Sequence, residues 1–519
     1  MKAMYAWKLF LNRLTKLFLA LIILVSSCTI KQKDDNYDYL IHGGTIIDGS
    51  GKKGFDSDIL ILDGKIVKIG KINPDEIDVI QTINATGMVV TPGFIDSHTH
   101  GDPIATPEFN NFIAMGVTTI VLGQDGVSPA NISEWMTDVE EARPSLNVAT
   151  LVGHGSIRDQ SGVKINPNPD PSSLNEMAWL VEEAMDLGCF GLSTGLEYQP
   201  GSFSNLDELV AIAIPVAKRK GIIHSHVRSE DKDKISESIA ELLQQGKGSG
   251  SAVQVSHMKI VYGKGREQAE HILQQMEKAR KSGTRVTGDI YPYTASYTGI
   301  GIVFPSWAKP PNDYKQVVKQ KREELAEYLR ERIALRNGPA ATLFGTQPWA
   351  GKTLEQVALE MNKAFEDVLI DDIGPGGASA AYFVMDQELQ DRLMIDPYVM
   401  ISSDGSPTMQ HPRGYGSFAK VLRYYVREKQ ALKLEQAIHK MTGLPARTLG
   451  LTKQKRGLIK TGFAADILVF DADKVKDKAD YENPHLLAEG FDFVMVNGKV
   501  VRKSGEFTGE RGGQMLKKK

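Results

Sequence analysis

The sequence predicts an α/β protein in which a TIM-like (β/α)8 barrel is joined to a small β-sandwich formed by both chain ends. Two observations support this fold class. In the middle of the chain, short apolar segments alternate with helical segments, and two β-rich stretches lie far apart, one near each end. A chain of 519 residues has room for one large barrel with a companion domain.

Composition excludes several other classes of protein. Hydrophobic residues make up 41% of the chain and charged residues 24%, which is typical of a globular protein. The net charge of -3 provides no basic surface for nucleic acid, so no nucleic-acid partner is expected. Two cysteines exclude a disulfide framework, and Cys189, among small and apolar residues, is expected to be a buried thiol.

Residues 1–28 have the pattern of a bacterial lipoprotein signal peptide. Four basic residues precede the apolar run Leu17 to Val25, which is far shorter than the roughly 20 residues of a membrane span. The following Val-Ser-Ser-Cys resembles a lipobox, so Cys28 is expected to carry the lipid and attach the protein to a membrane of the bacterial cell envelope, on the periplasmic or outer-membrane side. A plain signal peptide cut nearby, or an uncleaved anchor, is the alternative.

Residues 29–38, rich in Lys and Asp, are expected to form a flexible tether before the first folded element. The β-sandwich is then predicted from residues 39–90 and 450–505. In the first stretch, residues 56–70 alternate apolar and polar side chains around an Asp-Gly turn, which is typical of a hairpin. Residues 457–473 and 491–501 have the same character.

Residues 91–449 are predicted to form the barrel. Eight apolar segments qualify as parallel strands, and they lie at residues 88–100, 116–126, 147–155, 189–195, 221–228, 252–259, 285–293 and 398–405. Helical patterns, such as residues 174–188 and 206–221, separate most of them, as expected for βαβ units. In such barrels the carboxyl ends of the strands form the active face.

One interval between strands is too long for a simple connection. Residues 300–378, which include a charged helical segment at 314–335, are therefore expected to form an insertion near the barrel mouth. Two roles fit this segment equally well: it covers the pocket, or it is a peripheral stabilising subdomain.

Residues that can bind a metal ion cluster at the predicted strand ends. They are His98 and His100 after the first strand, Asp125 after the second, His226 after the fifth, His257 after the sixth and Asp404 after the eighth. Zinc prefers imidazole nitrogen and carboxylate oxygen, and residues two apart in a strand point to the same side. A single His-x-His pair is weak evidence, but the whole set predicts a metal site. The alternative is a group of hydrogen-bonded core residues.

At this point the chain resembles a known family. The motifs that carry the resemblance are GGTIIDGSG, TPGFIDSHTH, GVTTIVLGQDG, VGHGSIR, GLSTGLEYQPG, HSHVRSE, VSHMK, DIYPYTA, SSDG, HPRGYGSF and GFAADILVFD. They occur in the order found in the D-aminoacylase (N-acyl-D-amino-acid deacylase) family of the amidohydrolase superfamily, and they extend from Tyr39 to about Val501. The resemblance implies a metallo-dependent hydrolase barrel with a small β-sandwich, in agreement with the pattern of segments.

The resemblance also implies roles for the candidate metal ligands. His226 and His257 would hold a tight zinc ion, and His98 and His100 a weaker, more exposed one. Asp404 would lie beside the weaker metal and act as the proton shuttle. The best-known members bridge the two metals with a cysteine, where this chain has Asp125. Asp125 is thus the candidate bridge, and the alternative is an acceptor outside the coordination shell of a single-metal site.

Three more strand-end residues are candidates for supporting roles. His224 lies two residues before His226, but the family motif assigns the ligand to His226. His154 is expected to be a pocket residue or a partner of a ligand. Asp96 is expected to orient a ligand histidine.

Tyr198, Lys259 and Arg413 match family residues that hold the free carboxylate of a small-molecule substrate. Arg and Lys are charge-assisted donors to carboxylates, which suits this role. The expected activity is a zinc-dependent hydrolysis of the amide bond of N-acyl-D-amino acids. Two alternatives are cleavage of peptides containing D-residues, and a non-catalytic lipoprotein that binds a metal or ligand.

Overall fold

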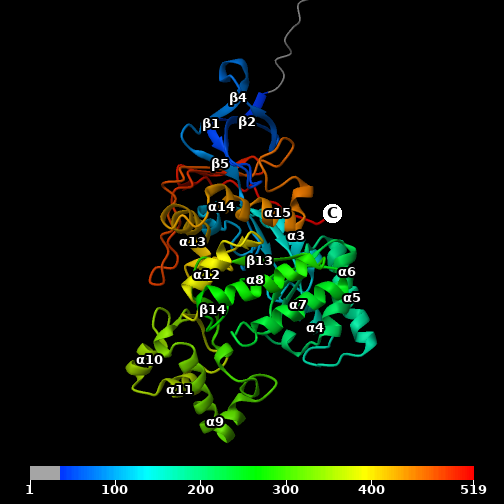
Figure 1. The fold of residues 1–519 in the computed structure, drawn as a ribbon, viewed down its shortest axis with the longest axis vertical. Helices are drawn as coiled ribbons and strands as arrows, with labels where there is room; N and C mark the ends of the chain where they lie inside the picture. Colours follow the sequence, from blue (N-terminus) through cyan, green and yellow to red (C-terminus); the bar gives the residue numbers. More distant parts are fainter. Residues whose placement is uncertain (1–35) are drawn as a thin grey trace, which may run out of the picture.

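The computed structural model describes residues 36–519, in three regions that Figure 1 shows along the long axis of the molecule. A β domain lies at one end, the helix-surrounded barrel lies in the middle, and a small helical lobe lies at the other end. Cys28 lies outside the described residues, so the predicted lipidation stays a prediction. In residues 36–519, no helix is long and apolar enough to cross a membrane.

The β domain is a nine-stranded sheet to which both chain ends contribute. Its strands are β1 (Asn36–Ile46), β2 (Phe55–Leu62), β3 (Lys65–Gly70), β4 (Asp78–Asn84), β5 (Val89–Pro92), β18 (Ile467–Phe470), β19 (Phe493–Val496), β20 (Lys499–Lys503) and β21 (Glu506–Phe507). The two halves meet where β18 pairs antiparallel with β5, with Ile467 opposite Pro92. The predicted small β-sandwich domain from both ends is confirmed, and its strands hydrogen-bond as one continuous sheet around a core that includes Ile46, Ile61 and Met495. Residues 36–38, predicted as the end of the tether, instead pair within β1 of this sheet.

All eight segments predicted as barrel strands contain strands. They are β6 (Phe94–Asp96), β7 (Val117–Leu122), β8 (Asn147–Thr150) with β9 (Val152–Gly153), β10 (Gly191–Gly195), β11 (Ile222–His226), β12 (Ala252–Val255), β13 (Val286–Ile290) and β17 (Val399–Ile401). Neighbours pair in parallel in two arcs, β6-β7-β8 and β9-β10-β11-β12-β13-β17, which meet where the third strand is interrupted at Leu151. The other junction closes through a parallel bridge between Thr99 and Gly405, so the predicted barrel is confirmed.

Helices surround the barrel strands (Figure 1). They are α2 (Asn110–Ala114), α3 (Ile132–Ala142), α4 (His154–Gln160), α5 (Pro171–Leu187), α6 (Leu206–Lys218), α7 (Ile235–Ser249), α8 (Gly265–Lys281), α12 (Gln387–Met394), α13 (Arg413–Lys420), α14 (Leu434–Met441) and α15 (Gly443–Leu449). Local signals set their ends. In α5 the Asp170 side chain accepts a hydrogen bond from the backbone N–H of Ser173, Pro171 occupies the first turn, and Gly188 ends the helix in the left-handed conformation.

The helical lobe arises from the long interval between β13 and α12. It contains α9 (Tyr314–Leu335), α10 (Leu354–Met361), α11 (Phe365–Asp367) and a sheet of β14 (Ser296–Gly299), β16 (Ser379–Tyr382) and β15 (Thr342–Phe344). The lobe has its own apolar core, in which Leu329 and Ile333 of α9 pack with residues such as Leu369. Residues 300–378, predicted as an insertion, lie within it.

Two buried side chains illustrate how the core is organised. Cys189 is fully buried, as expected, and burial raises the pKa of its thiol to about 12. Phe94 of β6 is also fully buried, and its ring stacks on Phe418 of α13 and meets Phe491 edge-on, both at 5.6 Å between ring centres. Phe94 therefore ties the first barrel strand to an outer helix and to the C-terminal part of the chain.

We predict that Phe94→Ala lowers the free energy of unfolding by about 3–5 kcal/mol, because it removes a large buried ring and leaves a cavity between three segments. Chemical denaturation measures the change. Phe55→Ala, at the exposed start of β2, is the control and should change stability by no more than about 0.5 kcal/mol. A Phe94→Ala protein as stable as the control would contradict this description of the core.

Candidate metal centre and substrate pocket

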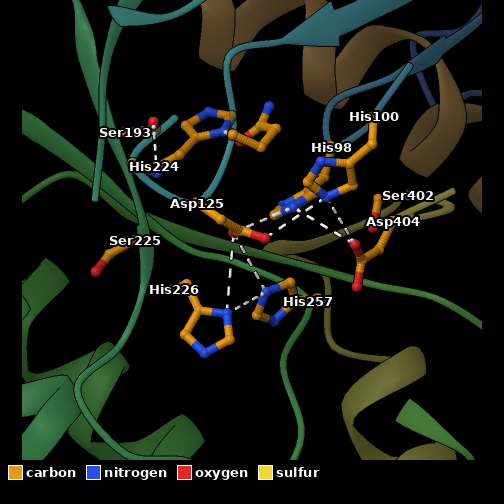
Figure 2. A network of polar contacts seen from close by, with 12 residues as sticks. His98, His100, Asp125, Ser193, His224, Ser225, His226, His257, Ser402 and Asp404 are labelled. Atoms are coloured by element: carbon orange, nitrogen blue, oxygen red, sulfur yellow. Dashed lines mark hydrogen bonds and ion pairs between the residues drawn. The ribbon is translucent and has the colours of Figure 1, made fainter. Parts of the chain in front are cut away.

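The six predicted metal-binding residues converge at the carboxyl ends of the barrel strands (Figure 2). His226 is the last residue of β11, and the others follow β6, β7, β12 and β17 directly or within a few residues. Three of them, Asp125, His257 and Asp404, have positive φ angles of 54°, 34° and 49°. Residues other than glycine seldom adopt this conformation, which costs free energy and is concentrated at functional sites.

Asp125 is the centre of the cluster and lies between two histidine pairs (Figure 2). Its Oδ1 is 3.4 Å from His98 Nε2 and its Oδ2 is 3.5 Å from His100 Nε2. On the other side, Oδ1 is 3.5 Å from His257 Nε2 and 3.9 Å from His226 Nδ1. The Asp125 carboxylate thus faces four imidazole rings, with one pair of histidines on either side of it.

Asp404 completes the side of the cluster that holds the first histidine pair. Its Oδ1 is 3.2 Å from His100 Nε2 and 3.7 Å from His98 Nε2. Three groups in residues 36–519 have metal-ligand spacing, and two of them share Asp125: His98, His100, Asp125 and Asp404 form one, and Asp125, His226 and His257 the other. The third group is Glu197, His226 and Glu230. Within each group one ligand atom per residue lies within 4.8 Å of all the others.

The chemistry of these groups fits divalent cations. Among residues 36–519, His98 Nε2 and Asp125 Oδ1 are buried without a hydrogen-bond partner. Such atoms are costly unless they are satisfied by another group. Burial alone would lower the pKa of His98, but the nearby carboxylates of Asp125 and Asp289 hold it well above its ordinary value. A bound cation would supply the positive charge that protons on the histidines otherwise provide.

Acidic side chains lie behind three of the histidines. Glu197 Oε2 is 3.0 Å from His226 Nε2, and Glu230 Oε1 is 3.2 Å from His257 Nδ1, so each contacts the ring nitrogen that faces away from Asp125. Asp289 Oδ1 is 3.8 Å from His98 Nδ1. Carboxylates in this position fix the tautomer and orientation of metal-binding histidines.

None of these three acids is among the predicted site residues. Asp289 lies at the end of β13, where the strand-end rule would have found it. Glu197 and Glu230 lie in loops beyond the ends of β10 and β11, and their partners depend on how those loops fold back.

The structure places three further strand-end residues. Asp96, expected to orient a ligand histidine, accepts hydrogen bonds from the backbone N–H groups of His98 and Ser403, so its contact with His98 is to the backbone and not to the ring. Burial raises the pKa of Asp96 to about 7. His154 pairs with buried Glu208 at 2.7 Å, and His224 contacts Gln124 at 3.3 Å, so neither belongs to any of the three metal-ligand groups.

A cavity of about 540 Å³ opens onto the cluster. Tyr198, Lys259 and Arg413, the predicted carboxylate-binding residues, all line it together with His100, Asp125, His226, His257 and Asp404. Burial raises the pKa of the Tyr198 hydroxyl well above its ordinary value, so it stays a neutral donor, and it lies 3.2 Å from Thr298 Oγ1. Ile302 and Arg336 of the helical lobe also line the cavity, which supports the covering role considered for this insertion.

Both charged carboxylate-binding candidates already contact acids. Lys259 Nζ donates to Glu230 Oε1 at 2.6 Å, and Arg413 Nη1 lies 2.7 Å from Asp404 Oδ2. Although burial alone would lower the pKa of Lys259, the Glu230 carboxylate raises it above its ordinary value. Burial alone would raise the pKa of Asp404, but the Arg413 charge, followed by that of His257, lowers it well below its ordinary value. Both cations stay charged, and Asp404 stays ionised.

The barrel, the shared Asp125 and the flanking histidines define a metal-dependent hydrolase. Comparison with known proteins supports this class. Residues 355–502 match the amidohydrolase family. The chain is 32% identical over 508 residues to the N-acyl-D-aspartate deacylase of Alcaligenes xylosoxydans xylosoxydans, with 92% of this chain and 95% of the relative covered. It is 31% identical over 512 residues to the D-aminoacylase of the same organism, with 92% and 97% covered.

Solved structures agree as well. An N-acyl-D-glutamate deacylase from Bordetella bronchiseptica, complexed with zinc and a phosphonate inhibitor that mimics the tetrahedral intermediate, superposes with a TM-score of 0.79 at 30% identity. The match covers 93% of this chain and all of that one. The chain belongs to the D-aminoacylase family of amidohydrolases. L-Hydantoinase from Arthrobacter aurescens, at 18% identity and a TM-score of 0.56, shares the fold.

We predict that His226→Ala weakens zinc binding by more than about 100-fold, because it removes a candidate ligand whose ring Glu197 holds in place. Metal analysis after equilibration with buffered zinc gives the affinity. His224→Gln is the matched control: it changes the same residue type two positions earlier in β11, and zinc affinity should stay close to that of the unmodified protein. Equal losses in both variants would contradict the assignment of His226 as a ligand.

Proposed function

We propose that the protein is a zinc-dependent hydrolase that cleaves the amide bond of N-acyl-D-amino acids to a carboxylate and a free D-amino acid. One observation carries the proposal: a single cavity is lined by members of both metal-ligand groups that share Asp125, beside three side chains suited to a free carboxylate. The full-length similarity to deacylases of N-acyl-D-amino acids supports the substrate class.

The residues favour one tight and one weaker zinc site. Asp125, His226 and His257 form the more enclosed group, and acids lie behind both histidines. His100, on the other side, is 37% exposed. Asp125 takes the place of a bridging cysteine, and its two oxygens suit it to join both sites. Zinc, when bound, lowers the pKa of a water toward about 7 and polarises an acyl carbonyl.

Asp404 is the proposed proton shuttle. It is ionised at neutral pH and lies on the cavity wall beside His100, where it can accept a proton from the attacking water. The same carboxyl group then returns the proton to the nitrogen of the leaving amine. In this scheme Arg413 must leave Asp404 to hold the substrate carboxylate, and that transfer raises the basicity of Asp404 when substrate is in place.

Lys259, Arg413 and Tyr198 are proposed to fix the substrate carboxylate. A guanidinium binds a carboxylate bidentately, while the ammonium and the phenol each donate from another direction. Lys259 lies two residues beyond His257, with its Nζ 2.8 Å from His257 Nδ1, so the anchored carboxylate stays close to the metal ligands. The scissile amide is thereby positioned over the cluster.

The proposed location is the bacterial cell envelope, with the barrel tethered to a membrane through a lipid on Cys28. The basic and apolar residues that precede Val-Ser-Ser-Cys support it. Metabolic labelling with a fatty acid, compared between the unmodified chain and Cys28→Ala, tests the attachment.

The direct test of the activity is a panel of N-acetyl-D- and N-acetyl-L-amino acids and D-residue dipeptides, with zinc-loaded protein and detection of released amine. Hydrolysis of N-acetyl-D-amino acids with little turnover of their L-enantiomers supports the proposal. Turnover of dipeptides alone would favour a peptidase. Bound zinc without turnover of any compound would favour a binding protein.

We predict that Asp404→Asn lowers kcat by about 100-fold or more, because the amide cannot accept the proton of water. Zinc content should largely persist, since His98, His100 and Asp125 remain on that side of the cluster. Steady-state kinetics and metal analysis of the same preparation measure both quantities. Normal turnover would exclude the shuttle role, and loss of all zinc would assign Asp404 a mainly structural role.

A further inference from the structure

Arg336 is a buried cation on the cavity wall, and none of the acids in residues 36–519 pairs with it. Its side chain is only 2% exposed, yet it lines the same cavity as the metal cluster. One hydrogen bond holds it, from Nη1 to the Tyr262 hydroxyl at 3.2 Å. Its Nε is buried without a partner within the described part of the chain. A buried guanidinium with unused donors is unfavourable unless an anion joins it.

The surroundings hold Arg336 in a defined place. It caps the C-terminal end of α9, and its guanidinium stacks on the ring of Tyr382 in β16, 4.5 Å from the ring centre. Tyr262, its hydrogen-bond partner, follows β12 in the loop that also carries His257 and Lys259. The helical lobe thus extends a fixed positive charge toward the loop that supplies a metal ligand.

Arg336 differs from the other cations near the cavity. Lys259 pairs with Glu230, Arg413 pairs with Asp404, and Arg332, one helical turn before Arg336, pairs with Asp231 at 2.9 Å. Arg336 has aromatic and hydroxyl neighbours in place of a carboxylate. Substrate is therefore the natural source of its counter-ion.

We propose that Arg336 binds a second carboxylate of the substrate, so that the enzyme prefers N-acyl-D-amino acids with acidic side chains. This inference rests on the proposed function. Lys259 and Arg413 contact His257 and Asp404 directly, which assigns the substrate's α-carboxylate to them, next to the metal. Arg336 lies on the lobe side of the cavity. A dicarboxylic substrate such as N-acyl-D-glutamate or N-acyl-D-aspartate has one carboxylate for Lys259 and Arg413 and a second for Arg336.

The first test needs no variant. N-acetyl-D-glutamate is compared with N-acetyl-D-glutamine, and N-acetyl-D-aspartate with N-acetyl-D-asparagine, since each pair differs mainly in the side-chain charge. With zinc-loaded protein, we expect kcat/KM for at least one acidic compound to exceed that of its amide by roughly 30-fold or more. Equal rates within both pairs, or faster hydrolysis of the amides, would overturn the inference.

The second test removes the guanidinium. Arg336→Met should lower kcat/KM for the preferred acidic substrate by roughly 30-fold or more and change that for N-acetyl-D-methionine by less than about threefold. Arg336→Lys keeps the charge but loses the planar donor pair, so it should recover part of the loss. Arg330→Met, on the same helix but paired with Glu366 and Glu323 outside the cavity, is the control and should match the unmodified protein.

The outcomes separate this inference from the proposed function. Hydrolysis of apolar N-acetyl-D-amino acids without any preference for acidic ones leaves the function intact and excludes the role of Arg336. An equal loss for all substrates in Arg336→Met would assign Arg336 to the α-carboxylate and also overturn the inference. If no N-acyl-D-amino acid is hydrolysed, the proposed function itself fails. If Arg336→Met does not fold, the comparison of acid and amide substrates with the unmodified protein still tests the preference for acidic side chains.

Discussion

The contact of one carboxylate, Asp125, with four histidines is the constraint on which the rest of the structure depends. The four histidines come from the ends of three barrel strands, β6, β11 and β12, which the closed ring of parallel strands brings to one group. Asp125 itself adopts a left-handed backbone conformation to face them. The barrel's apolar core supports this arrangement, while acids behind the rings keep them oriented.

Charge organises the cavity beyond the metal cluster. The acids outnumber the cations at the centre, as suits a site that holds divalent metal, and the two nearest cations are each matched to an acid. Farther out, the helical lobe contributes Arg336, which pairs with no acid among residues 36–519. The metal centre and the lobe would therefore have different roles. The metal centre would activate the scissile amide bond, and the lobe would select the side chain of the substrate.

Much of the barrel and of the candidate metal centre could be predicted from the sequence, because both depend on local patterns of apolar segments and the residues at their ends. Strand-end placement predicted His98, His100, Asp125, His226, His257 and Asp404, since each ends an apolar segment or follows one within a few residues. The positions of Glu197, Glu230 and Arg336 depend instead on how loops and the helical lobe fold back onto the barrel. Arg336 lies at the end of a charged helix in the insertion, where nothing in the sequence distinguishes it from neighbouring arginines. Only its burial beside Tyr382 sets it apart.

We propose that Asp125 joins two metal sites in place of a cysteine. Anomalous X-ray diffraction at the zinc edge, from crystals equilibrated with zinc, tests it most directly. We expect one strong peak about 2.0–2.2 Å from Asp125, His226 and His257, and a second, weaker peak that Asp125 shares with His98 and His100. Zinc bound by the histidines with the Asp125 carboxylate outside coordination distance would contradict the account.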